Sequence, residues 1–99
     1  MKPKQLIIKV NETESFVLYK MAREFFDGNV SAFLRYAALD YKRPRMDREL
    51  ECKRTRLMLL KMSLEEYLHV YQQAKKLTDG NVSRYIRTAA LCCVRVEDV

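Results

Sequence analysis

The chain has 99 residues, a formal net charge of +6, 48% hydrophobic residues and 32% charged residues, with two Gly and two Pro. This length indicates one domain, and this composition supplies a modest hydrophobic core while excluding a disordered tail. The first apolar run, residues 6–8, is too short for a signal peptide or a membrane span. We therefore expect a cytoplasmic protein without membrane contact.

The residues that commonly carry catalysis or bind metals are sparse. Cys52, Cys92 and Cys93 lack the spacing of a metal site, which favours reduced thiols. His69, the only histidine, falls in a helical segment beside the apolar face, as expected of a surface or boundary residue. The sequence has no base beside a nucleophile, no Gly-rich phosphate loop and no carboxylate pair at a defined spacing. We expect no enzyme activity, no cofactor and no bound metal.

The positive charge is concentrated in one segment. Residues 42–56 contain seven Lys or Arg against three Asp or Glu, whereas residues 1–41 contain six against five and residues 57–99 contain six against five. A basic segment between two nearly neutral units suits an acidic polymer such as nucleic acid. A solvated linker would also be rich in charge, so both interpretations stay open.

The pentapeptide Asp-Gly-Asn-Val-Ser occurs twice, at residues 27–31 and 79–83, an offset of 52 (79 minus 27). Aligning residues 4–41 with 56–93 gives 13 identities in 38 positions. A unit of about 40 residues rarely folds alone, so we expect the two copies to share one core. The prediction is a single domain over residues 1–99, with units at 4–41 and 56–93 and a basic connector at 42–55.

Each unit opens with an apolar segment of strand length, at residues 5–10 and 57–62. The second has fewer β-branched residues and could be helical on propensity alone, but its equivalence to the first favours a strand. Alternation gives an apolar inner face made of Leu6, Ile8, Val10, Met58, Leu60 and Met62. The outer face consists of Gln5, Ile7, Lys9, Leu57, Leu59 and Lys61.

A helix is predicted next, at residues 12–26 and again at 64–77. Asn11 with Glu14, and Ser63 with Glu66, have the spacing of a capping box. Gly28 and Gly80 are expected to end these helices in the left-handed conformation. The apolar face of the second copy is predicted to contain Leu64, Tyr67, Leu68, Tyr71 and Ala74.

A second helix is predicted to start directly after Asn29 or Asn81, which would cap it. Its apolar stripe is Val30, Phe33, Leu34, Ala37, Ala38 and Tyr41 in the first unit, and Val82, Tyr85, Ile86, Ala89, Ala90 and Cys93 in the second. The paired alanines allow close approach of another helix. This pattern fits a helix that crosses its symmetry mate.

A lone strand leaves its backbone groups unpaired, so we expect the two strands to pair with each other. The fold class is then mainly α with a two-stranded antiparallel ribbon (α+β), on one side of four helices. The connector of 14 residues (42–55) could span about 45 Å when extended, so pairing within one chain is feasible. Pairing between two chains stays open.

The pattern resembles the ribbon-helix-helix superfamily, to which the Arc and methionine repressors belong. The resemblance covers about three quarters of the chain and rests on the strand ends Lys-Val-Asn or Lys-Met-Ser, the Gly turn, and Asn-Val-Ser-x-aromatic-aliphatic-Arg at the second helix. Most members have one copy per chain and dimerise. The tandem form is similar to accessory proteins of conjugation and plasmid mobilisation, which bind the transfer origin.

The resemblance implies that the ribbon enters the major groove of double-stranded DNA and that its outer face reads bases. The base-reading residues are then Gln5, Ile7, Lys9, Leu57, Leu59 and Lys61. Gln can bond adenine, Lys can reach guanine, and apolar side chains can meet thymine methyl groups. Ile7, Leu57 and Leu59 depart from a polar reading face. Methyl contacts, stacking against another protein, or a shifted register that places them inside would each explain this departure.

The resemblance also implies a phosphate site at the start of each second helix, where free amides and the helix dipole favour anions. These residues are Asn29, Val30, Ser31, Asn81, Val82 and Ser83, although simple capping would also account for the Asn. Further phosphate contacts could come from Lys2, Lys4, Arg43, Arg45, Arg54 and Arg56, which would add affinity without reading sequence. Arg35 and Arg87 lie beside the helix stripe and could instead pair with carboxylates.

The expected function is sequence-specific DNA binding, as a transcriptional repressor or as a relaxosome accessory protein at a transfer origin. Partners would be double-stranded DNA, further copies of the chain on DNA, or a relaxase. One alternative is a protein-interaction module that keeps the fold without DNA binding. Another is an antitoxin-type regulator, for which residues 94–99 leave little toxin-binding tail.

Overall fold

The computed structural model describes residues 4–40 and 53–97, with side chains as far as residue 93. Its elements, in chain order, are β1 (Lys4–Val10), α1 (Glu12–Phe25), α2 (Val30–Leu39), β2 (Arg56–Met62), α3 (Leu64–Leu77) and α4 (Val82–Glu97). The prediction of a mainly helical protein with a two-stranded sheet is confirmed. The strand prediction for residues 57–62 is also confirmed, despite the weak β-propensity of that segment.

The two strands pair antiparallel along their whole length, from Lys4 opposite Met62 to Val10 opposite Arg56. Ile7 and Leu59 face each other in the middle of this two-stranded ribbon. The predicted inner face is confirmed: Ile8, Val10, Met58, Leu60 and Met62 are buried and Leu6 is partly buried. The ribbon therefore forms within one chain, and its backbone pairing needs no second molecule.

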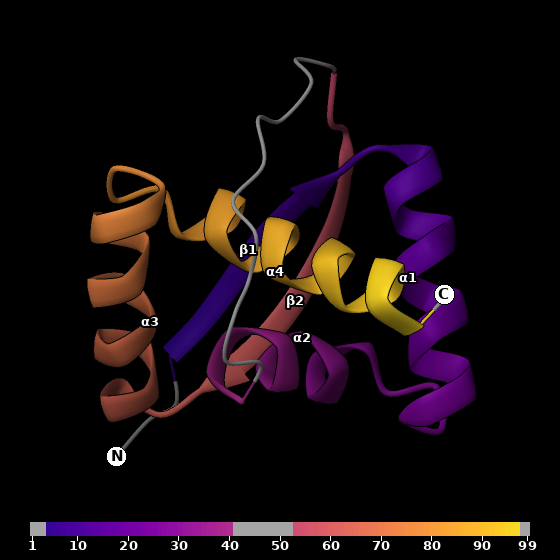
Figure 1. Cartoon of the computed structure of the whole chain (residues 1–99), viewed down its shortest axis with the longest axis horizontal. Coiled ribbons are helices and arrows are strands. Elements are labelled where there is room, and N and C mark those ends of the chain that lie inside the picture. The colour runs from indigo at the N-terminus through magenta and orange to yellow at the C-terminus, as the bar shows by residue number, and fades with distance from the viewer. Residues whose placement is uncertain (1–3, 41–52, 98–99) are drawn as a thin grey trace.

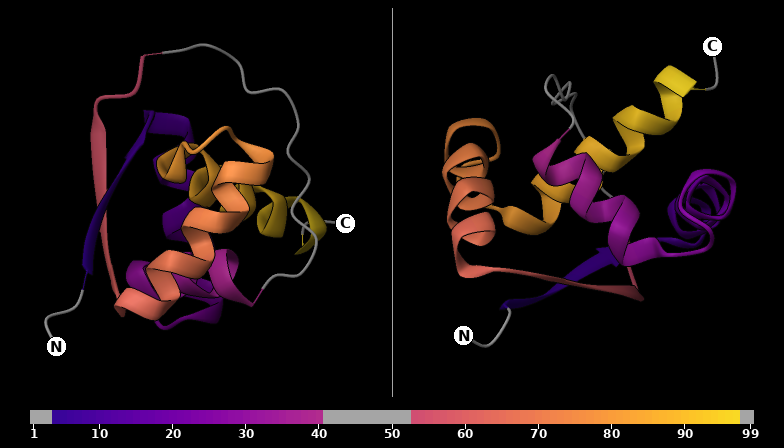
Figure 2. Two further views of the ribbon diagram at one scale, coloured as in Figure 1. Left: turned by 90° about the vertical axis from the view of Figure 1, so that its left-hand side faces the viewer. Right: turned by 90° about the horizontal axis from the view of Figure 1, so that it is seen from below.

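All four helices lie on one side of the ribbon (Figures 1 and 2). In Figure 1 the ribbon runs diagonally between α3 at the left and α1 at the right, while α2 and α4 cross each other against its inner face. The side view in Figure 2 shows that the opposite face of the ribbon has no helix over it. None of the described helices combines the length and the apolar character needed to cross a bilayer.

The core lies where α2 and α4 meet the ribbon. The predicted stripes are confirmed there, because Phe33, Leu34, Ala37 and Ala38 of α2 are buried, as are Tyr85, Ile86, Ala89, Ala90 and Cys93 of α4. Val30 and Val82 pack against this core while partly exposed, and Tyr41 lies outside the described residues. The buried alanines lie where α2 packs against α4, and small residues at such a contact allow close approach of two helices.

The predicted apolar face of α3 is wrong in part. Of its five predicted members, Ala74 is fully buried and Tyr67 packs against the core, but Leu64, Leu68 and Tyr71 are 49%, 49% and 40% exposed. Val70, which was not predicted to lie on this face, is fully buried. α3 lies at one end of the bundle and packs against α4 and α2 along a narrow stripe. The buried stripe runs through Tyr67, Val70 and Ala74, to one side of Leu64 and Leu68.

The helix ends follow the predicted capping chemistry. Both capping boxes are present, at Asn11 with Glu14 and at Ser63 with Glu66. Gly28 and Gly80 are left-handed, with φ of 82° and 86°. The aspartates before them, Asp27 and Asp79, are also left-handed, with φ of 53° and 55°, a feature not predicted from the sequence. Asp tolerates this conformation better than most residues, so the turn itself favours Asp-Gly.

Candidate nucleic-acid interface

The outer face of the ribbon consists of the six predicted residues, all of them exposed: Gln5, Ile7, Lys9, Leu57, Leu59 and Lys61. Ile7, Leu57 and Leu59 are 54%, 56% and 51% exposed. The shifted register that would have placed these three inside is therefore wrong. A slip of one residue would move Ile8 and Leu60, which are 1% exposed, to the solvent side.

The outer residues form three cross-strand pairs. Ile7 and Leu59 make the central pair, Gln5 lies opposite Lys61 on one side, and Lys9 lies opposite Leu57 on the other. An apolar centre is thus flanked by one lysine on each side. The cationic amines can reach acceptors on base edges or phosphates, and the aliphatic centre suits the methyl group of thymine.

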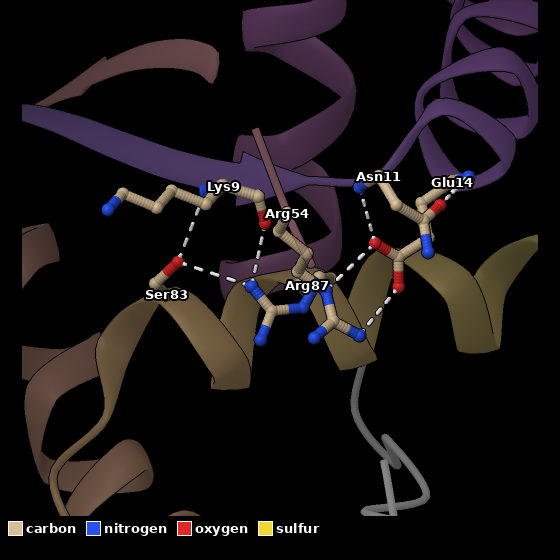
Figure 3. Close-up of polar contacts among 6 residues, drawn as sticks. All are labelled: Lys9, Asn11, Glu14, Arg54, Ser83 and Arg87. Atoms are coloured by element: carbon tan, nitrogen blue, oxygen red, sulfur yellow. Dashed lines mark hydrogen bonds and ion pairs between the residues drawn. The ribbon is translucent and has the colours of Figure 1, made fainter. Parts of the chain in front are cut away.

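Two polar side chains of α4, Ser83 and Arg87, bond the edge of β1 that faces away from β2 (Figure 3). The Arg87 Nη1 donates to the carbonyl oxygen of Lys9 at 2.7 Å. The Ser83 Oγ accepts weaker bonds from the Lys9 N–H and from Arg87 Nη1, each at 3.4 Å. Lys9 therefore directs its backbone groups away from β2, and Lys9 and Leu57 form a non-hydrogen-bonded pair, whose side chains lie close together.

The role of Arg87 could not be decided from the sequence, which left pairing with a carboxylate as one possibility. Arg87 is only 6% exposed although it is charged, and its bond to the Lys9 carbonyl positions the strand that presents Lys9. Its presence at the same place in both sequence units, as Arg35 and Arg87, was the available signal. Arg35 itself has a different role, since its Nη2 pairs with Glu66 Oε2 at 2.8 Å.

The helix N-termini behind the ribbon are capped as predicted. The Asn29 Oδ1 accepts from the Ala32 N–H at 2.9 Å, and the Asn81 Oδ1 accepts from the Arg84 N–H at 3.0 Å. The cap and the left-handed turn together account for Asp, Gly and Asn in the repeated pentapeptide. The occurrence of these three residues in both units is therefore explained without a ligand. Only Val and Ser of the repeated pentapeptide are left as a signal for phosphate binding.

The two serines differ in their surroundings. The Ser83 hydroxyl is engaged with Lys9 and Arg87, as described above. No hydrogen bond joins the Ser31 hydroxyl to the described part of the chain, and Ser31 is partly exposed. Of the two predicted phosphate positions, the one at α2 thus offers the more available hydroxyl.

The basic residues predicted to contact phosphates lie in different settings. Arg54 binds Glu14 through two bonds of 2.9 and 3.0 Å, and the two side chains are only 13% and 12% exposed. This bidentate pair, shown in Figure 3, uses the donors that a phosphate would need. The Arg56 Nη2 lies 3.7 Å from the Glu12 Oε1, and the Arg56 side chain is 57% exposed.

Lys4 places its Nζ 4.8 Å from the centre of the Tyr67 ring, at the end of the ribbon. Lys2, Arg43 and Arg45 lie outside the described residues. Among the positions that the structure describes, no group of three or more His, Cys, Asp or Glu could hold a metal ion. The outer face of the ribbon itself presents cationic, amide and aliphatic groups.

Comparison with known proteins gives no assignment. No protein-family model, no curated protein and no solved structure matches the chain. The functional argument therefore depends on the geometry and chemistry of the chain itself.

Proposed function

We propose that the chain is a tandem ribbon-helix-helix protein that binds double-stranded DNA sequence-specifically, by inserting its ribbon into the major groove. The observation that carries this proposal is the uncovered outer face of the ribbon, with Lys9 and Lys61 on either side of the Ile7–Leu59 pair. A two-stranded ribbon fits the width of the major groove, where each base pair presents a distinct pattern of donors, acceptors and methyl groups.

The chemistry of the six outer residues suggests the kind of site. The aliphatic pair Ile7 and Leu59 would lie against thymine methyl groups, so the central base pairs should be A·T. Lys9 and Lys61 would bond guanine acceptors on either side. Gln5 and Leu57 occupy corresponding positions in the two units, and this difference should make the two half-sites similar but not identical.

Phosphate contacts would hold the ribbon in register. The free amides at the start of α2, with the Ser31 hydroxyl, are suited to an anion, and the corresponding amides at Val82 and Ser83 are suited to a second. Lys4 and Arg56, the first residues of β1 and β2, are exposed at opposite ends of the ribbon and could add contacts. Such contacts would raise affinity for all duplexes and make binding sensitive to salt.

In a cytoplasmic setting, such a protein would act as a transcriptional repressor or as a relaxosome accessory protein at a transfer origin, with a relaxase as partner. A protein-interaction module without DNA binding is the competing function. It is favoured by the same exposed residues, Ile7, Leu57 and Leu59, because a protein surface could also cover them. An antitoxin role has no comparable observation in its support.

Selection of bound duplexes from a random pool tests the proposal. We expect enrichment of a short, nearly palindromic motif with A·T base pairs at its centre. The double variant Lys9→Ala/Lys61→Ala, whose changes lie on the solvent face, is the matched control and should enrich no motif or a degenerate one. Recovery of no motif by the unchanged chain would contradict sequence-specific binding and favour the protein-interaction module.

A further inference from the structure

A groove of about 620 Å³ opens between α2 and the first turns of α3. Its apolar wall is formed by Phe26, Tyr36 and Leu39, and the rings of Phe26 and Tyr36 lie 5.6 Å apart. No residue of either strand lines it. The groove is therefore separate from the outer face of the ribbon.

The polar side of this groove is acidic although the whole chain is basic. Asp40, Glu65 and Glu66 line it, against one guanidinium, that of Arg35. Counted over the residues that the structure describes, three carboxylates and one arginine give this lining a formal charge of −2, in a chain of net charge +6. A cationic group is the complementary ligand for such a groove.

The other half of the molecule shows how such a carboxylate is used. Glu14 occupies the position 52 residues before Glu66, and both carboxylates complete a capping box. At Glu14 the guanidinium of Arg54 makes two bonds, to Oε1 and Oε2. The nearly buried Arg54 comes from the segment before β2, not from the helices. In the first unit, the carboxylate of the capping box, Glu14, thus already binds an arginine through two bonds.

At Glu66 the bonds from residues 4–40 and 53–97 use only part of the same acceptor capacity. Its Oε1 accepts from the Ser63 N–H, and its Oε2 accepts from Arg35, at 2.8 Å each. A carboxylate has about four acceptor positions, and within the described residues one on each oxygen is occupied. The pair with Arg35 is also more open than its counterpart, with side chains 45% and 29% exposed. The residue 52 positions before Arg54 is Lys2, outside the described residues, and a lysine lacks the planar fork of arginine.

We propose that this groove docks an arginine side chain from a basic, apolar-flanked peptide segment of a partner protein. The guanidinium would bond Glu65 and Glu66 while its plane lies against the Tyr36 ring, and the neighbouring apolar residue would pack on Phe26 and Leu39. This site would let a partner bind while the ribbon is on DNA. The proposal does not depend on DNA binding, and each can fail without the other.

The test uses the full chain and the labelled peptide Gly-Ser-Arg-Leu-Ser-Gly as probe, with a second peptide that has Lys in place of Arg. Backbone amide NMR shifts should change around Tyr36, Glu65 and His69, and the Arg peptide should bind about tenfold more tightly than the Lys peptide, because the bidentate geometry is lost. Equal binding of both peptides, or shift changes spread over acidic residues elsewhere, would overturn the proposal.

Charge-matched variants separate the groove from general acidity. Asp40→Asn/Glu65→Gln should weaken the Arg peptide about tenfold, since two charges that face the ligand are removed. Glu24→Gln/Asp79→Asn removes the same number of exposed charges outside the groove and should leave affinity unchanged; Asn tolerates the left-handed backbone at residue 79. Equal losses in both double variants would contradict the site. The selected duplex, added in excess, should not displace the peptide.

Discussion

Ile7 and Leu59 lie directly opposite each other at the centre of the ribbon, and they are 52 residues apart, the same offset that separates the two pentapeptides. The register therefore pairs corresponding residues of the two units at the centre. On one side Gln5 lies opposite Lys61, and on the other Leu57, its counterpart, lies opposite Lys9. The outer face is thus nearly symmetric in chemistry: Lys9 matches Lys61, Ile7 matches another aliphatic residue, Leu59, and only Gln5 differs in polarity from its counterpart Leu57.

The two outer lysines should carry part of the base preference. Lys9→Ala or Lys61→Ala should each lower the preference for the selected duplex over a random duplex by about 1–3 kcal/mol, because a base contact is lost. Fluorescence anisotropy with both duplexes measures this preference. Ser31→Ala is the control and should weaken both duplexes alike, since a phosphate contact carries no sequence information. Equal losses on both duplexes for the lysine variants would refute the ribbon as the reading element.

Substitutions in the apolar centre of the outer face can show whether its partner is DNA or a protein. Ile7→Ser/Leu59→Ser should reduce discrimination between thymine and uracil at the central positions, because uracil lacks only the methyl group. Both residues are more than half exposed, so the change should leave the free energy of unfolding nearly unaltered. If the unchanged chain binds thymine and uracil duplexes equally, the methyl-contact explanation is wrong and stacking against a protein is favoured.

Arg87 and Arg35 should differ in their contribution to stability although they occupy corresponding positions. Arg87→Ala removes a buried donor from the Lys9 carbonyl and should lower the free energy of unfolding by about 1–3 kcal/mol. Arg35→Ala breaks an exposed ion pair and should cost at most about 1 kcal/mol. Urea denaturation of both variants gives the comparison. A larger loss for Arg35→Ala would contradict the positioning role of Arg87.

Glu66 should give a defined pH dependence. The Ser63 backbone N–H and then the Arg35 guanidinium hold the pKa of this carboxyl below its ordinary value of 4.5. A carboxyl with a lowered folded-state pKa stabilises the fold above that ordinary value, and the contribution is lost as pH falls through the folded-state pKa. Glutamine can still complete a capping box, so Glu66→Gln removes the charge and keeps the cap.

The stability difference between the unchanged chain and Glu66→Gln should therefore be constant above about pH 5 and shrink below pH 4.5. Urea denaturation at several pH values measures it. Glu65→Gln, on the same helical turn but outside the capping box, shows how much of the change comes from charge at the helix start. A difference that stays constant down to about pH 3 would contradict the role of the Glu66 charge.

The strands, the helix ends and the core stripes could be predicted because each depends on local sequence. Alternation fixed the inner face of the ribbon, and the equivalence of the two units decided that residues 57–62 form a strand. The buried face of α3 was predicted wrongly in part because the prediction followed the large apolar residues, and several of these are exposed in the structure. Ala74 was predicted correctly, but the buried Val70 was left out, and the position of α3 at one end of the bundle leaves Leu64 and Leu68 exposed.

The polar contacts behind the ribbon could not be predicted in the same way. Arg54 pairs with Glu14 across 40 residues, and Arg87 reaches the Lys9 carbonyl across 78. Such pairs depend on which side chains the folded chain brings together, and a basic connector gives no signal that one of its arginines is nearly buried. The exposed outer face of the ribbon could be predicted from the sequence, but the side-chain contacts of Arg54 and Arg87 could not.

The most direct test of the central claim is a salt titration of the full chain on the selected duplex and on a scrambled duplex of equal length, by fluorescence anisotropy. The account predicts tighter binding to the selected duplex at about 150 mM salt, with affinity for both falling steeply as salt rises because counterions are released from the phosphates. Equal affinity for the two duplexes at that salt concentration would contradict sequence-specific reading by the ribbon.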